Sequence, residues 1–285
     1  GVKLTRRDLK SAIDDICDPA VMSAALVKKG IDPDTLDIPG CLMFNPGGKN
    51  TFSLRKLDGS GRTEFVMDSR DDWGFTDGMK RGYSGMDVYL ERQFDGKWEA
   101  RIDYTYSRSK GNLEGQVKSD NGQDNISKTS DWDSASLMQY AYGYLPNDRR
   151  HQLKVRGSYQ INDEWMLGAN FRINSGSPFS CSGFFNPGNV DEGTAAADPV
   201  GYGQSIYHTC FGAIATPGSA RNPWNRTLDL GVTYRPAMLD GKLTLGMQVR
   251  NVMDANEVLQ ANVQSETGAY TVSNTYMLPQ GRQEP

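Results

Sequence analysis

The sequence predicts an all-β fold: a segment of an antiparallel up-and-down transmembrane β-barrel with short periplasmic turns and long extracellular loops. Three observations predict it. Six segments alternate apolar and polar residues, short and long links alternate strictly between them, and aromatic residues gather at the segment ends. A bundle of membrane-spanning helices is excluded, because the mean hydropathy is -0.60 and no window offers the roughly eighteen apolar residues that a spanning helix needs.

Each of the six segments has an apolar and a polar face, because successive side chains of a β-strand point to opposite sides. In the clearest one, residues 97–106, Trp98 and Ile102 share the apolar face and charged residues occupy the other. The other complete segments cover 86–91, 152–161, 165–174, 227–234 and 242–250, and a partial strand covers 1–3. We expect the following apolar side chains to face lipid: Trp98, Ile102, Val155, Phe171, Leu230 and Leu245.

The links between these segments favour a barrel. Alternation alone also suits a soluble sandwich with one wet face. The short links carry turn residues at Asp95-Gly96, Asn162-Asp163 and 236–241. The long links cover 5–80, 107–149, 175–225 and the stretch from 254 onward. In an up-and-down barrel every second connection lies on the same side of the membrane, so strict alternation of short and long links is what a barrel produces.

One helix is expected within the first long link, over residues 10–29. Ile13, Ile16, Ala20 and Ala24 recur there at spacings of three and four residues, and Pro19 is the main breaker.

The four cysteines predict two loop disulfides. Cys17 and Cys41 share one polar stretch, Cys181 and Cys210 share another, and no CxxC motif is present. Pairing within each stretch closes one loop without crossing a strand, so both bonds are expected on the extracellular side. The alternative is four unpaired thiols, because disulfides persist only in an oxidising compartment.

Several motifs resemble TonB-dependent outer-membrane receptors, particularly the long-looped, Oar-like members. Residues 143–151 read GYLPNDRRH and resemble the family's LP(N/Y)DRRH segment, and 172–178 read RINSGSP and resemble its strand end with SGxP. Residues 225–230, 241–244 and 251–254 resemble its LDL, KLTL and NVFN hairpin, with Met253-Asp254 where Phe-Asn is usual. The resemblance runs from about residue 80 to 254.

The resemblance implies a multi-pass protein of the bacterial outer membrane that captures a scarce ligand and imports it with energy from the TonB complex. Residues 1–285 show no plug domain, TonB-contacting segment or aromatic-ended final strand. A family barrel has about 22 strands, so we expect a partial barrel domain completed by other strands. The implied partners are outer-membrane lipid, the remainder of the barrel and its plug, the TonB complex and an unknown ligand. A structural or adhesive barrel that binds a surface protein without transport is the alternative.

Two groups of side chains are candidates for contacting ligand or partner. The loop 107–149 mixes carboxylates with aromatic rings, which suits stacking on and hydrogen bonding to a polar ligand, although a loop that only caps the barrel is an equal alternative. Its candidates are Asp120, Asp124, Asp131, Trp132, Asp133, Tyr140, Tyr142 and Tyr144. The second group should face the lumen, where charges avoid lipid and meet the plug or substrate: Arg101, Asp103, Lys154, Arg156, Arg172 and Asp229.

The sequence offers no case for an enzyme, a cofactor or a metal site. The two histidines, His151 beside two arginines and His208 near Cys210, have no nucleophile and base arranged around them. Residues 58–64 and 120–124 lack the full oxygen-ligand series of a Ca²⁺ loop. A net charge of -4 without a basic stripe also argues against nucleic-acid binding.

Overall fold

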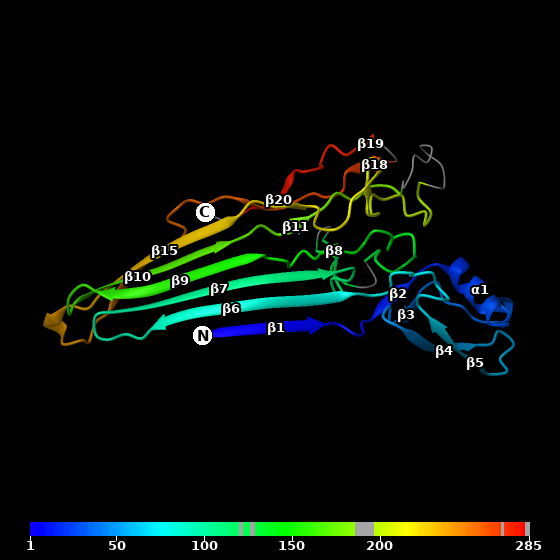
Figure 1. Ribbon diagram of the computed structural model, residues 1–285, viewed down its shortest axis with the longest axis horizontal. Helices are drawn as coiled ribbons and strands as arrows, with labels where there is room; N and C mark the ends of the chain where they lie inside the picture. Colours follow the sequence, from blue (N-terminus) through cyan, green and yellow to red (C-terminus); the bar gives the residue numbers. More distant parts are fainter. Residues whose placement is uncertain (120–121, 126–128, 186–196, 269–270, 283–285) are drawn as a thin grey trace.

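The computed structural model describes all residues except 120–121, 126–128, 186–196, 269–270 and 283–285. Its main feature is an eight-stranded antiparallel sheet in the order β1-β6-β7-β9-β10-β15-β16, with β8 pairing to β7 (Figure 1). The strands are β1 (Val2–Asp8), β6 (Arg81–Arg92), β7 (Trp98–Gly111), β8 (Gly143–Tyr144), β9 (His151–Gln160), β10 (Trp165–Asn174), β15 (Asn225–Tyr234) and β16 (Leu245–Val249). The predicted meander is confirmed. The partial strand at 1–3 extends to residue 8, and the segment 86–91 extends to 81–92.

The two faces of this sheet differ as the alternation predicts. Register pairs Ile102 with Val155 and Val155 with Phe171, so apolar side chains from neighbouring strands lie together on one face. Val155 and Phe171 are half-buried among these neighbours. The other four predicted lipid-facing side chains are exposed, at 39% for Trp98, 38% for Ile102, 41% for Leu230 and 52% for Leu245. No second sheet seals this apolar face among the described residues, which fits a face turned to lipid.

Short links gather at one end of the sheet, and side-chain acceptors fix two of them. The Asp95 carboxylate accepts hydrogen bonds from the backbone N–H groups of Lys97 and Trp98, at 3.0 and 3.1 Å. Asn162 plays the same role for the N–H groups of residues 164 and 165, at 3.0 and 2.9 Å. The third link holds a short 3-10 helix, Ala237–Leu239. These local bonds set the turns and hence the strand register.

The first long link, residues 9–80, folds into a compact unit at the other end of the sheet (Figure 1). Its elements are β2 (Asp14–Ile16), α1 (Pro19–Lys28), a 3-10 helix (Pro33–Thr35), β3 (Leu42–Phe44), β4 (Lys49–Arg55) and β5 (Arg62–Asp68). Trp132 and Met138 from the second long link, residues 112–150, pack into the same apolar core. We call the unit formed by residues 9–80 and the described part of 112–150 the cap.

The predicted helix over 10–29 is correct only in its second half. Asp18 is the N-cap, because its carboxylate accepts a hydrogen bond from the Val21 N–H at 3.1 Å. Pro19 stands in the first turn, where its missing N–H costs nothing, so it starts the helix and does not break it. Residues Asp14–Ile16 instead pair with Leu42–Phe44 as two short strands.

Sequence analysis missed the hairpin of β4 and β5. Residues 58–61 turn the chain, and the Asp58 carboxylate accepts from the Ser60 N–H at 2.8 Å. Phe52 and Phe65 lie opposite each other in the register, with ring centroids 5.7 Å apart. The alternation of Phe52 with Leu54 was a usable signal, although it covers too few residues to stand out from a loop.

The remaining long links form small strand pairs at the same end of the sheet (Figure 1). They are β11 (Pro178–Phe179) with β14 (Ala220–Arg221), β12 (Thr209–Cys210) with β13 (Ala213–Ile214), β17 (Val258–Ala261) with β20 (Pro279–Arg282), and β18 (Glu266–Gly268) with β19 (Thr271–Val272). Both predicted disulfides, Cys17–Cys41 and Cys181–Cys210, are present. None of the helices in the described part of the chain has the length and apolar character needed to cross a membrane.

Candidate functional site

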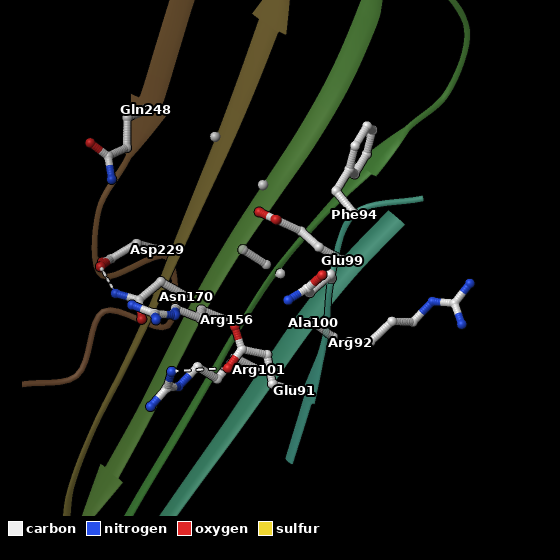
Figure 2. Close-up of a pocket in the computed structure, with 15 residues that line it drawn as sticks. Glu91, Arg92, Phe94, Glu99, Ala100, Arg101, Arg156, Asn170, Asp229 and Gln248 are labelled. Atoms are coloured by element: carbon white, nitrogen blue, oxygen red, sulfur yellow. Dashed lines mark hydrogen bonds and ion pairs between the residues drawn. The ribbon is translucent and has the colours of Figure 1, made fainter. Parts of the chain in front are cut away.

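The polar face of the main sheet carries a hollow of about 550 Å³, lined by residues of β6, β7, β9, β10, β15 and β16 and by the link after β6 (Figure 2). Gly168 and Gly231 lie opposite each other in the register on this face, and the absence of side chains there leaves the space open. Charged and amide side chains surround it. Figure 2 shows Arg101, Arg156, Asn170 and Asp229 around this hollow.

Hydrogen bonds hold several of these polar side chains in place. The Arg101 guanidinium donates to the Asp103 carboxylate at 2.9 Å and to Glu91 at 3.2 Å. Asn170 donates its amide to the Asp229 carboxylate at 3.2 Å (Figure 2). These hydrogen bonds satisfy the charges of Arg101 and Asp229 and still leave polar atoms directed into the hollow.

All six predicted lumen-facing residues share this one polar face. The register sets Asp103 opposite Lys154, Lys154 opposite Arg172, and Asn170 opposite both Arg156 and Asp229. The six are Arg101, Asp103, Lys154, Arg156, Arg172 and Asp229. Cross-strand register therefore gathers residues from four strands into one charged surface.

The second predicted group is dispersed, and Trp132 is the clearest correction. Its side chain is fully buried in the cap, with its ring centroid 5.0 Å from that of Phe75. A buried indole offers no surface to a ligand, so the expected ligand contact through Trp132 does not hold in this structure. Its role is to anchor the second long link in the core of the first.

Asp131 and Asp133 both make structural contacts with the long links. Asp131 forms an ion pair with Lys118 at 2.5 Å. The buried Asp133 carboxylate accepts a hydrogen bond from the Tyr202 hydroxyl at 2.8 Å, and its backbone oxygen accepts from the Cys17 N–H at 3.2 Å. The Asp131 ion pair lies within the second long link, whereas the Asp133 contacts join that link to the first and third, so both carboxylates are structural in this arrangement.

Buried carboxylates accumulate at this junction. Burial, together with the nearby charges of Asp15 and Asp131, raises the pKa of Asp14 to about 8 and that of Asp133 to about 7. Among the described residues, the grouping with metal-like spacing joins Asp15 to Cys17 and Cys41. Their sulfurs form a disulfide, so no thiolate is present to bind a metal.

The remaining candidates lie at the edge of the cap. Tyr140 is half-buried and lines a cavity of about 290 Å³ within the cap, beside Thr76 and Gln139. Tyr142 is 44% exposed. Tyr144 lies beneath the Lys110 ammonium, 4.4 Å from its ring centroid. Asp124 is exposed, and Asp120 lies outside the described residues.

Asp148 within the GYLPNDRRH motif has a structural role that sequence analysis missed. Its carboxylate is buried and accepts hydrogen bonds from the Ser109 N–H at 2.6 Å and from the Arg221 guanidinium. Arg149 donates to the Ser175 carbonyl at 3.1 Å, and Arg221 donates to the Gly176 carbonyl at 3.2 Å. The motif thereby ties the ends of β7, β9 and β10 to the third long link.

No family model matches the chain. The chain is 31% identical over 204 residues to the "TonB-dependent transporter Oar" of Myxococcus xanthus, a match that covers 70% of this chain and 16% of that protein. The matched region is thus about a sixth of the curated relative's length. Among solved structures, the chain is similar to the outer membrane transporter YddB from Escherichia coli, with 13% identity and a TM-score of 0.41 over 84% of this chain and 28% of that chain.

Proposed function

The chain belongs to the TonB-dependent outer-membrane transporters, and on this premise we propose that it forms part of the barrel wall and the extracellular cap of an energy-coupled importer. In this proposal residues 1–285 are a partial barrel domain. The plug, the earlier strands and the final strand belong to the rest of the protein, and the plug passes the pull of the TonB complex to the barrel. The proposed cargo is a scarce ligand.

The observation that carries this proposal is the two-faced sheet with long links folded over one end. One face presents an apolar band suited to lipid, and the other presents a hollow surrounded by Arg101, Arg156, Asn170 and Asp229. A wall that is apolar outside and charged inside separates lipid from a polar passage. The cap stands where such a passage opens, so a ligand arriving from outside meets it first.

We assign initial contact to the cavity beside Tyr140 and later contact to the polar face of the sheet. The cavity combines an aromatic ring with the polar side chains of Thr76 and Gln139, a combination that suits a polar ligand. Arg156 is exposed on the polar face and available to a passing ligand.

Uptake by the full-length protein tests the proposal. Cells with and without the protein are offered labelled siderophores, oligosaccharides, peptides and cobalamin at limiting concentration, with and without a proton-motive-force uncoupler. We expect accumulation of at least one class that depends on the protein and is abolished by the uncoupler. Arg156→Gln should lower that uptake several-fold, whereas Lys97→Gln at the short-turn end should leave it unchanged.

The same experiment addresses the structural or adhesive alternative. If the surface-displayed protein retains a partner protein on cells but no ligand accumulates in an uncoupler-sensitive way, the import proposal is wrong. The protein is then a structural or adhesive barrel that binds a surface protein without transport.

A further inference from the structure

A basic groove lies on the apolar side of the sheet where β1, β6 and β7 meet the cap. It has a volume of about 560 Å³. Register explains its shape. Ser84 of β6 is flanked by Arg6 of β1 and Arg108 of β7, and Gly82 is flanked in the same way by Asp8 and Lys110. The small residues Gly82 and Ser84 on the middle strand therefore form the bottom of the groove, and longer charged side chains on the two neighbouring strands form its sides.

The groove is strongly positive. Of its charged lining residues six are basic and one, Asp8, is acidic. The basic residues are Arg6, Lys10, Lys80, Arg81, Arg108 and Lys110. The side chains of Arg6 and Lys80 are 82% and 50% exposed, and their ion pairs with Asp8 and Asp77 are long, at 3.4 and 3.5 Å. Such exposed pairs are weak and leave both cations able to bind an added anion.

Apolar and aromatic side chains continue directly below the groove on the same face. The next row in the register is Leu4, Met86 and Tyr106, and Leu4 is 77% exposed. Tyr106 accepts a hydrogen bond from the Arg108 guanidinium at 3.0 Å, so a ring that belongs to the apolar band is tied to the charged row above it. The charges thus begin where the lipid-facing band ends, at the end of the sheet that carries the long links.

Tyr142 covers the cap side of the groove. Its ring lies 5.7 Å from the Lys80 ammonium and 5.9 Å from that of Lys110. An exposed tyrosine between cations at the edge of an apolar band is typical of the interface between lipid and water. Tyr142 therefore lines this groove, and its expected role in ligand capture stays a prediction.

We propose that this groove binds the phosphate-bearing headgroup of a lipid in the outer leaflet, with the acyl chains lying along Leu4, Met86 and Tyr106. Guanidinium groups match the geometry of phosphate oxygens, and ammonium groups add charge without a directional requirement. A free phosphate satisfies the groove but leaves the exposed apolar row below it uncovered. A phosphorylated lipid covers both, which is why we commit to that occupant.

Binding of lipid A to the full-length protein in detergent tests the proposal. The probe is lipid A with both phosphates, and the controls are the same glycolipid without phosphates and inorganic phosphate as a competitor. Arg108→Gln with Lys110→Gln should weaken binding roughly tenfold, as expected for two basic residues at an anionic surface. Arg6→Gln with Lys10→Gln, on the other wall, should weaken it comparably.

The matched control removes two exposed charges from the short-turn end of the same sheet, by Lys97→Gln with Lys242→Gln, and should bind like wild type. Heat modifiability and surface display establish that each variant assembles. Equal binding by wild type and both groove variants overturns the proposal, as does equal binding of the phosphate-free glycolipid. Displacement of bound lipid A by millimolar inorganic phosphate overturns the commitment to a lipid.

Discussion

Replacing Trp132 by alanine should release the second long link from its packing against the first long link and leave the main sheet intact. The indole is fully buried, and it packs among residues of the first long link although it belongs to the second. Truncating a buried tryptophan to alanine typically costs about 3 to 5 kcal/mol. The sheet does not include this residue, so the cost falls on the cap.

Limited proteolysis of intact cells measures this effect. Wild-type cap should resist cleavage, and the Trp132→Ala variant should be cut within residues 112–150 at least a hundredfold faster if cleavage follows the open population. Tyr142→Ala is the matched control, because its side chain lies in the same link but is 44% exposed. Wild-type protease resistance in the Trp132 variant, with normal surface display, would refute the shared core.

Three further predictions concern the cap and its attachment. Removing the Cys17–Cys41 disulfide by paired serine substitutions should lower the free energy of unfolding of the cap by about 3 kcal/mol, measured by denaturant titration followed by proteolysis. The free energy of unfolding of the cap should fall as pH rises from about 4 toward 8. The reason is that the pKa of Asp14 is raised from 3.8 to about 8, so the folded cap keeps a proton that the unfolded chain releases. In thermal melts, Asp14→Asn should reduce this pH dependence by up to about 1.4 kcal/mol per pH unit. Asp148→Ala should destabilise by about 1 to 3 kcal/mol, because the buried Ser109 N–H and the Arg221 guanidinium both lose the Asp148 carboxylate as acceptor. Losses from Asp148→Ala and Arg221→Ala that are purely additive in the double variant would contradict the pairing.

The sheet could be predicted from the sequence because its signals are local and repeated. Strands of ten residues such as 165–174 carry enough alternation to stand out, and the turn residues Asp95 and Asn162 act on N–H groups two and three positions away. The strands of this sheet are neighbours in the order in which they follow along the chain, and the short turns fix the register of β6 with β7, β9 with β10 and β15 with β16. The register across the long links, such as Asp8 opposite Gly82, depends on contacts far apart in the sequence. The charged surface followed from the same alternation, because it consists of the polar faces of these strands.

The cap and its residues could not be predicted in the same way. Its core joins Ile16, Phe75 and Trp132, which lie far apart in the chain, so burial there depends on tertiary packing. Trp132 and Asp133 were chosen as ligand contacts for their residue types, but residue type does not say whether a loop side chain points outward. The basic groove could not be predicted for a related reason, because its residues come from three strands and the cap, which are far apart in the sequence.

The first long link leaves and re-enters the sheet at adjacent points. β1 ends at Asp8, which lies directly opposite Gly82 at the start of β6. Residues 9–80 are inserted at this one hairpin position, where a turn of a few residues would also close the same two strands. Residues 9–80 are therefore an insert that a different folded unit can replace while strand order and shear are inherited unchanged, provided that the new unit also buries Trp132 and Met138 of the second long link.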